Sequence, residues 1–128
     1  MIEIALDEKG NGVFQKDISE KQKISNKYLD NIITSLKTAG LIVNKRGRKS
    51  GYRLSRNASE ISLLDIYKAF EPAISIVDCI ADDYDCGLLN TCSVREFWLG
   101  LNNHIISYFE SFTLKDLVIN HKTLAMQS

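Results

Sequence analysis

The stretch from residue 18 to residue 54 constrains the fold of this 128-residue chain more than any other. It predicts a helix over residues 15–22, a turn at 22–24, a second helix and then a short hairpin. Ser25 is a good N-cap for the second helix, because its hydroxyl can accept from a free backbone N–H. Gly40 suits the end of that helix. This order predicts a helix-turn-helix followed by a wing.

The turn and the second helix carry the details of this prediction. Lys23 stands where such turns often have glycine, so either Lys23 is left-handed or the turn is of another type. Ile24 is expected to be the buried residue of the turn. The apolar face of the helix, at positions i, i+3, i+4 and i+7, contains Leu29, Ile32, Ile33 and Leu36.

The opposite face of the second helix is polar near its start, with Asn26, Lys27, Asp30 and Asn31. Side chains at the start of such a helix reach base edges when the helix lies in a major groove. Asn31 can pair with adenine, and Lys27 can reach a guanine edge or a phosphate. The alternative is an ordinary solvated face, and the helix alone favours that alternative.

The hairpin is strongly basic, and this favours DNA binding over an ordinary solvated face. Residues 41–44 and 52–54 predict its strands, and its tip carries Lys45, Arg46, Arg48 and Lys49. From Lys37 to Arg56 there are seven Lys or Arg and no acid, although the whole chain has zero net charge. Such a stripe indicates phosphate binding, and an arginine at a loop tip suits a minor groove. The alternative is a solvated basic hairpin.

Composition places the chain among ordinary globular proteins. Its hydrophobic content of 45% is too high for disorder, and no apolar stretch approaches the roughly 20 residues of a membrane span. Three cysteines in a chain without a signal-peptide pattern indicate a reducing cytoplasm. Residues 1–7 are helical in character but uncapped, so we expect the natural helix to begin further upstream.

The second half of the chain predicts two further helices. Ser62 and Asp65 form a capping pattern at the start of a short helix, and Pro72 marks where that helix has ended. Its apolar face contains Leu63, Ile66, Tyr67 and Phe70. Residues 73–77 form an extended connector. Ser93 and Glu96 then predict a capping box for a long helix.

The long helix carries an apolar stripe of Val94, Phe97, Trp98, Leu101, Ile105, Tyr108, Phe109 and Phe112. This stripe extends over about 30 Å of helix, which is too long and too aromatic for so small a domain to cover. We therefore expect a symmetric dimer across it; the alternative is an intramolecular core helix. Residues 113–118 predict one more capped turn, and residues 120–128 a frayed tail.

Three cysteines, Cys79, Cys86 and Cys92, lie in a segment with neither helical nor strand periodicity. Their spacing is not the C-x2-C pattern of zinc sites, and zinc needs a fourth ligand. Thiolates are natural ligands of iron–sulfur clusters, which also accept histidine or carboxylate as a fourth donor. Cys92 precedes a helix N-terminus, which favours its thiolate form. Three aspartates in the loop count against an anionic cluster, and the alternative is three unrelated apolar residues.

The sequence gives little support for catalysis. His104 and His121 are the two histidines, and neither forms a nucleophilic set with a serine or a cysteine. Glycine-rich phosphate loops and metal-binding helix motifs are absent from the sequence. We therefore expect a protein that is not an enzyme.

Together these motifs resemble the family of bacterial regulators that includes IscR, NsrR and CymR. The first half matches at Asp17-Ile18-Ser19-Glu20, Ile24-Ser25, Lys27-Tyr28-Leu29-Asp30, Ala39-Gly40-Leu41-Ile42, Arg46-Gly47 and Gly51-Tyr52-Arg53-Leu54. The second half matches at Ile61-Ser62-Leu63, Asp65-Ile66, Val77-Asp78-Cys79, the three-cysteine loop, Phe97-Trp98, Thr113-Leu114 and Asp116-Leu117. The resemblance covers nearly the whole chain, and the combination is specific.

The resemblance implies a winged-helix repressor or activator that binds palindromic promoter DNA as a homodimer through its long helices. By position it places Asn26, Lys27, Tyr28 and Asn31 on a recognition helix, and Arg46 on the wing.

The resemblance also implies that Cys79, Cys86 and Cys92 occupy the positions of iron–sulfur ligands. Three departures accompany this implication. Arg95 stands where IscR has a histidine ligand, the family's opening residues are absent before Met1, and the first cysteine gap is six residues instead of five.

The sequence thus predicts a mainly α fold with a winged helix-turn-helix DNA-binding domain and a two-stranded β wing (1–72), a connector with the cysteine loop (73–92), and a long dimerisation helix with a tail (93–128). The predicted function is a cytoplasmic, dimeric, sequence-specific DNA-binding regulator that senses redox state, nitric oxide or iron–sulfur status through its cysteines. The candidate DNA-contacting residues are Ser25, Asn26, Lys27, Tyr28, Asn31, Lys45, Arg46, Arg48, Lys49 and Tyr52. The alternatives are a cluster-free regulator with a protein partner, a protein-interaction module with inert cysteines, and a structural zinc domain.

Overall fold

The structure is a computed structural model of the chain that describes residues 1–45, 51–81, 87–88 and 91–127. Its elements are α1 (Ile2–Ala5), α2 (Gln15–Gln22), α3 (Asn26–Thr38), β1 (Ile42–Asn44), β2 (Tyr52–Leu54), the 3-10 turn η1 (Ala58–Glu60), α4 (Leu63–Lys68), the 3-10 turn η2 (Asp78–Ile80), α5 (Arg95–Ser111) and α6 (Leu114–Gln127). The two strands pair antiparallel, with Ile42 opposite Leu54 and Asn44 opposite Tyr52. The predicted mainly α fold with a two-stranded wing is confirmed.

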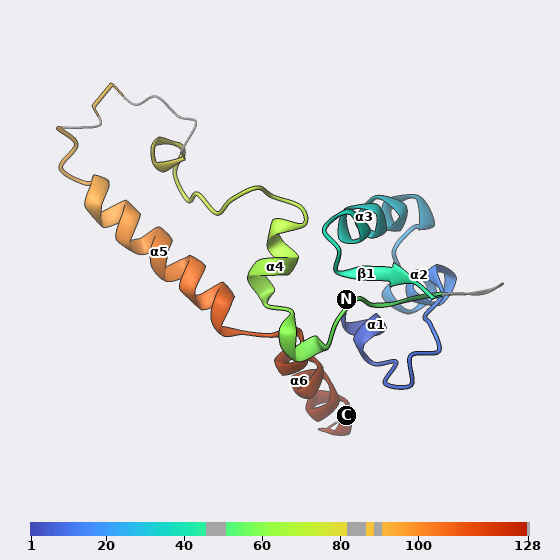
Figure 1. Cartoon of the computed structure of the whole chain (residues 1–128). Helices are drawn as coiled ribbons and strands as arrows, with labels where there is room; N and C mark the ends of the chain where they lie inside the picture. Colours follow the sequence, from blue (N-terminus) through green and yellow to red (C-terminus); the bar gives the residue numbers. More distant parts are fainter. Residues whose placement is uncertain (46–50, 82–86, 89–90, 128) are drawn as a thin grey trace.

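Figure 1 shows a body made of α1, α2, α3 and the sheet, from which α5 slants away. Helix α4 lies between this body and α5, and α6 packs against α1 and η1. The segment that contains η2 lies near the end of α5 that is far from the body. Among the described residues, no helix combines the length and the apolarity that crossing a membrane requires.

The core lies inside the body, and two residues from later in the chain, Ile61 and Leu114, complete it. Its buried side chains are Ile4, Ile18, Leu29, Ile33, Leu36, Leu41, Ile42, Ile61 and Leu114. Fully burying a side chain of this size stabilises the fold by about 1.5–3 kcal/mol. Three of the four residues on the predicted face of α3 are therefore core, and Ile32 packs against them half-buried.

The turn between α2 and α3 contains a left-handed residue at Lys23, which is one of the two predicted geometries. Lys23 adopts left-handed backbone with φ 53°, and the Ile24 backbone N–H donates to the Ser19 carbonyl at 3.2 Å. The Ser25 hydroxyl accepts from the Tyr28 backbone N–H at 3.2 Å, which confirms the predicted N-cap. Gly40, with φ 74°, follows the last turn of α3 as predicted.

Two predictions about the second half of the chain are wrong. Ser93 does not cap α5, because the helix begins at Arg95 after Val94, whose side chain makes no cap bond. The Arg95 backbone N–H instead donates to the Cys92 carbonyl at 3.4 Å, so the preceding turn supplies this bond. Residues 120–127 are not a frayed tail but the end of α6, because Leu114 and Val118 bury its inner face and Lys122 pairs with Glu8.

The capping pattern of α4 is confirmed, but its apolar face is shifted. Ser62 and Asp65 exchange both bonds of a capping box, each at 3.0 Å. Leu64, which was not part of the predicted face, is the buried residue of α4. Phe70 lies beyond the last helical residue and is 47% exposed.

Candidate nucleic-acid interface

Hydrogen bonds from α2 fix how α3 is presented to solvent. Gln15 Nε2 donates to Asp30 Oδ1 at 2.5 Å and to the Asn26 carbonyl at 3.2 Å. Ser19 Oγ donates to the Ile24 carbonyl at 2.6 Å. These bonds join the start of α3 to the first residue of α2, and the turn before α3 to the middle of α2, so the two helices hold a fixed relative orientation. Asp30 thereby serves as an anchor inside the motif.

The predicted contact residues at the start of α3 lie together on one exposed surface. Ser25, Asn26, Lys27, Tyr28 and Asn31 are all exposed, while the opposite face of the helix is core. Tyr28 is 62% exposed although it is large and apolar over most of its surface. This arrangement leaves amide, amine and phenol groups free to contact a partner.

The wing extends from the same body, and part of it can be described. The Lys45 backbone N–H donates to the Gly51 carbonyl at 2.9 Å, and the side chain of Lys45 is half-exposed. Tyr52 is half-buried, with the Lys37 ammonium 5.7 Å from its ring centroid. Arg46, Arg48 and Lys49 lie outside the described residues.

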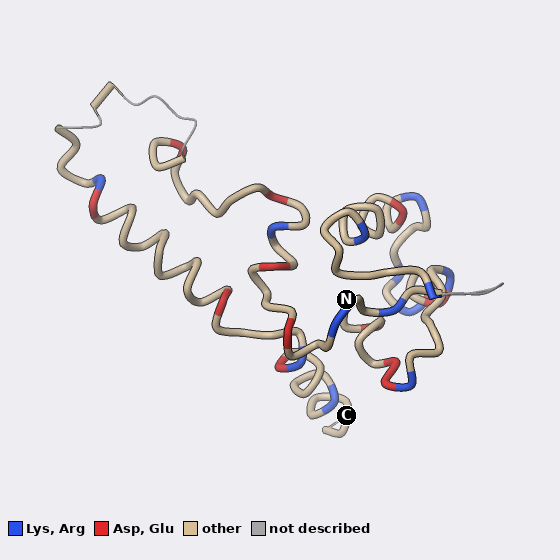
Figure 2. The backbone as a smooth tube through the Cα atoms, viewed as in Figure 1, with Lys and Arg blue, Asp and Glu red and all other residues tan. Residues whose placement is uncertain are grey.

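The base of the wing is held by a third segment. The Val13 and Tyr52 backbones exchange two bonds, of 2.9 and 2.8 Å. Gly51 approaches this segment so closely that a Cβ would lie 2.5 Å from the Val13 carbonyl. Figure 2 shows Lys and Arg recurring along α2, α3 and the hairpin, whereas the middle of α5 carries no charge.

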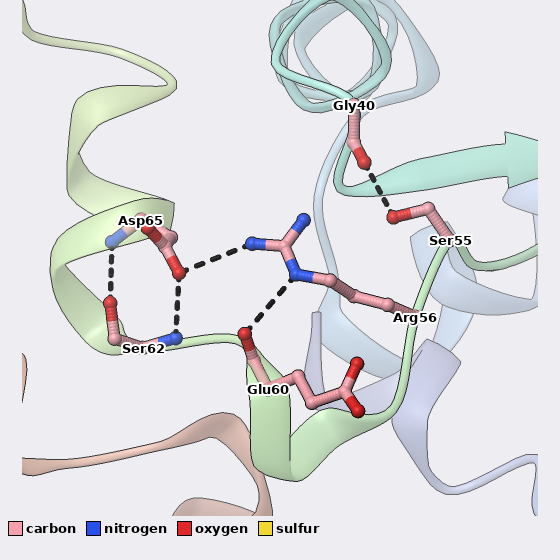
Figure 3. Close-up of polar contacts among 6 residues, drawn as sticks. All are labelled: Gly40, Ser55, Arg56, Glu60, Ser62 and Asp65. Carbon is pink, nitrogen blue, oxygen red and sulfur yellow. Dashed lines mark hydrogen bonds and ion pairs between the residues drawn. The ribbon is translucent and has the colours of Figure 1, made fainter.

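Arg56 fastens the wing to α4 through a contact that the sequence did not indicate (Figure 3). Its Nε donates to the Glu60 carbonyl at 3.1 Å, and its guanidinium pairs with Asp65 Oδ2 at 3.2 Å. The backbone N–H of Ser62, together with Arg56, holds the pKa of Asp65 below its usual value. The end of β2 and the start of α4 are therefore joined by one polar network.

The connector and the cysteine loop (73–92) together form what we call the cysteine segment. Its described part is attached to α5 at two points, neither of which was predicted. Asn102 is 7% exposed; its amide donates to the Ile74 carbonyl at 2.8 Å and its carbonyl accepts from the Ile76 N–H at 3.0 Å. Arg95 Nη1 donates to the Cys79 carbonyl at 3.2 Å. A lone amide inside an apolar stripe is the signal that could have identified Asn102.

The described cysteines fit a cluster in part. Cys79 lies in η2 and Cys92 just before α5; both are half-buried free thiols, the ligand type that iron–sulfur clusters use. Cys86 lies outside the described residues. Arg95, in the position of the expected fourth ligand, only donates hydrogen bonds and cannot bind a metal. Within the described part of the chain, no group of three or more Cys, His, Asp or Glu is arranged to hold a metal.

Sequence comparisons identify relatives over almost the whole chain. The Rrf2 family, described as an iron-dependent transcriptional regulator, matches residues 1–120. The HTH-type transcriptional regulator IscR of Vibrio cholerae is 31% identical over 124 residues, which are 97% of this chain and 71% of that protein. IscR of Pectobacterium atrosepticum is also 31% identical over 124 residues, with 97% and 75% covered.

Solved structures with the same architecture include CymR, described as the global cysteine regulator of B. subtilis. It superposes with a TM-score of 0.75 at 28% identity, over 93% of this chain and 87% of that chain. IscR of T. potens superposes with a TM-score of 0.71 at 27% identity, over 94% and 78%. The winged-helix arrangement of the body is therefore shared with both.

Proposed function

The chain belongs to the Rrf2 family of transcriptional regulators, and from this premise we propose that it binds double-stranded promoter DNA as a homodimer. The start of α3 enters the major groove, and the wing lies against the neighbouring backbone or minor groove. The observation that carries this proposal is the surface at the start of α3. Its polar side chains are exposed, while the inner face of the helix packs in the core and Asp30 accepts a hydrogen bond from Gln15 of α2.

Charge distribution supports DNA as the partner. The stretch from Lys37 to Arg56 is cationic throughout, in a chain whose net charge is zero. Lys and Arg on such a surface bind phosphates and release counterions, which supplies affinity without sequence preference. Asn31 and Lys27 supply the base-reading chemistry. A regulator of this kind acts in the cytoplasm, and its relatives are named for transcriptional regulation, which is a non-enzymatic role.

We further propose that the cysteine segment is the sensor. Cys79, Cys86 and Cys92 would hold an iron–sulfur cluster, which supplies a centre that can be oxidised and reduced. The residues of the chain make this segment a suitable control point. Asn102 and Arg95 fasten it to α5, so a change at the cysteines moves the end of that helix.

A cluster-free regulator is the second candidate, and one observation favours it. Arg95 occupies the position of the expected fourth ligand, and its guanidinium donates a hydrogen bond to the Cys79 carbonyl instead of binding a metal. Iron and acid-labile sulfide analysis of anaerobically purified protein separates the two candidates. Stoichiometric iron and sulfide support the cluster, their absence supports the cluster-free regulator, and stoichiometric zinc contradicts both.

Binding to DNA from the protein's own promoter tests the main proposal. Asn31→Ala should weaken binding to this DNA by about 1–3 kcal/mol, because it removes a base-edge contact, and should hardly change binding to random DNA. Asn103→Ala, at an exposed position on α5 and outside the helix-turn-helix and the wing, is the matched control and should bind like the wild type. Equal affinity for promoter and random DNA would contradict sequence-specific recognition.

A further inference from the structure

An apolar groove of about 680 Å³ lies on the inner side of α3 and is bounded by α1, α2, α4, α6 and Phe109 near the end of α5. Sites for drug-sized organic ligands have volumes of roughly 300–1,000 Å³ and mostly apolar walls. Leu29, Ile32 and Leu36 of α3 form one wall, and Leu63 and Ile66 of α4 belong to another. The groove therefore has the size and the lining of a site for an organic molecule.

Three aromatic side chains, Tyr67, Phe70 and Phe109, line the groove. The rings of Tyr67 and Phe109 meet edge-on, with their centroids 5.3 Å apart. Phe70 lies beyond the last residue of α4 and is half-exposed, so its ring is not covered as a core ring would be. Aromatic faces attract cations as well as apolar groups.

Glu3 is the one acidic side chain of the groove, and no Lys or Arg side chain is among the described residues that line it. The Glu3 side chain is only 12% exposed, and its Oε1 accepts from Nε2 of Gln22, which also lines the groove, at 2.9 Å. A carboxylate in a partly enclosed apolar groove attracts positive charge more strongly than one in open water.

Two positive groups near Glu3 neutralise it only in part. Lys21 Nζ lies 3.3 Å from Glu3 Oε2, but Lys21 is 66% exposed and does not line the groove, and such exposed ion pairs are weak. Burial lowers the pKa of the Met1 amino group, so this group also offsets less of the Glu3 charge. The groove therefore keeps a negative charge beside its apolar and aromatic walls.

We propose that this groove binds a lipophilic organic cation, whose apolar or aromatic groups lie against α3 and α4 while Glu3 attracts its positive charge. The lining decides between classes of ligand. An anion would be repelled by Glu3, and a highly polar molecule would find few hydrogen-bond partners, because the other polar side chains there are Gln22, Tyr67 and His121.

The position of the groove makes the cation an effector of DNA binding. Leu29, Ile32 and Leu36 belong to the inner face of α3, and Ile24 belongs to the turn before it. An occupant thus touches the back of the helix whose start carries the candidate DNA contacts. A ligand that binds two arrangements of this helix unequally must change its affinity for DNA. This role rests on the DNA binding proposed above, whereas the cation site itself does not.

Calorimetric titration of the whole chain, without DNA, tests the cation site. The probes are tetraphenylphosphonium and triphenylphosphine oxide, which carry similar rings but differ in charge. We expect the cation to bind with a dissociation constant at least about tenfold lower than that of the uncharged oxide. Equal constants would show a groove that does not recognise charge, and the absence of any binding of the cation would show no site; either result overturns the proposal.

Two variants with matched controls show whether the cation lies in the groove. Glu3→Gln should weaken binding of tetraphenylphosphonium about tenfold, whereas Glu20→Gln, an exposed acid of α2 outside the groove, should not. Phe70→Ala should weaken it about threefold or more, because an aromatic face is lost. Phe14→Ala, which removes a similarly exposed ring outside the groove, should have no effect. Unchanged binding by both groove variants would place the cation elsewhere and overturn the proposal.

Fluorescence anisotropy with promoter DNA tests the effector role. Tetraphenylphosphonium should change the promoter affinity of the wild type, and Glu3→Gln should need about tenfold more cation for the same change. A cation that binds in the groove but leaves promoter affinity unchanged overturns the effector role. Failure of the wild type to bind promoter DNA without the cation would instead remove the proposed function and leave the calorimetric result standing.

Discussion

At Gly51 the wing passes so close to residue 13 that there is no room for a side chain. A Cβ on Gly51 would lie 2.5 Å from the Val13 carbonyl carbon and oxygen and 2.6 Å from its nitrogen. Backbone atoms cannot move aside as a flexible side chain can, so the two Val13–Tyr52 hydrogen bonds would have to lengthen. The geometry of the wing base therefore depends on this one glycine.

Gly51→Ala should lower the free energy of unfolding by about 1–3 kcal/mol, the usual cost of overpacking, and should weaken DNA binding by displacing the wing. Gly100→Ala is the matched control, because a Cβ there meets nothing within 4 Å. In the interior of α5 this control should gain about 0.5–1 kcal/mol. Urea unfolding measures both, and an unchanged Gly51→Ala midpoint would show that the wing base tolerates a side chain.

Features that depend on neighbouring residues could be predicted from the sequence. Features that depend on residues far apart in the sequence could not. Ser25, Gly40 and the left-handed option for Lys23 follow from the geometry of a single turn, which is a property of neighbouring residues. The need for glycine at position 51 comes from Val13, which is 38 residues away in the sequence. No periodicity in the sequence records such an approach.

At the scale of elements, the position of the connector against α5 depends on Asn102. Its side chain satisfies the Ile74 carbonyl and the Ile76 N–H as a neighbouring strand would. Removing the amide leaves a buried donor and a buried acceptor unpaired. The attachment of the cysteine segment to α5 is weakened with it.

Asn102→Ala should destabilise the chain by about 1–3 kcal/mol, the cost of leaving buried polar groups unsatisfied. Its neighbour Asn103 is exposed and takes no part in this network, so Asn103→Ala should be neutral within about 0.5 kcal/mol. Amide hydrogen exchange of residues 73–80 should rise in the first variant alone. Equal exchange in both variants would show that apolar packing, and not the amide, holds the connector.

The ends of elements show why the remaining predictions failed. The Ser93 capping box has the right residue types, but the preceding turn already binds the Arg95 N–H, so α5 begins without it. The last residues were expected to fray because nothing in the sequence showed that Leu114 and Val118 would pack against the start of the chain. Helix ends depend on tertiary contacts, whereas the middle of α3 could be predicted from its own periodicity.

At the scale of the whole molecule, the sequence predicted the apolar stripe on α5 but not the groove beside the end of that helix. The stripe is visible as a pattern of apolar residues. The groove is formed by residues from six helices that come together only in the fold. That the side chains at the start of α3 contact DNA, and that some of them read bases, stays a prediction.

The salt dependence of DNA affinity shows how many chains bind one DNA site. Each phosphate contact adds about 0.9 to the slope of log affinity against log salt concentration. A two-fold complex contains Lys45 twice, so Lys45→Ala should reduce the slope by about 1.8, whereas a single bound chain would lose about 0.9. Asn31→Ala removes no charge; it should lower the affinity at every salt concentration and leave the slope unchanged. Fluorescence anisotropy with promoter DNA between low and physiological salt gives both slopes. A reduction near 0.9 for Lys45→Ala would mean that one chain binds alone, and the symmetric complex would then be wrong even if the DNA contacts are right.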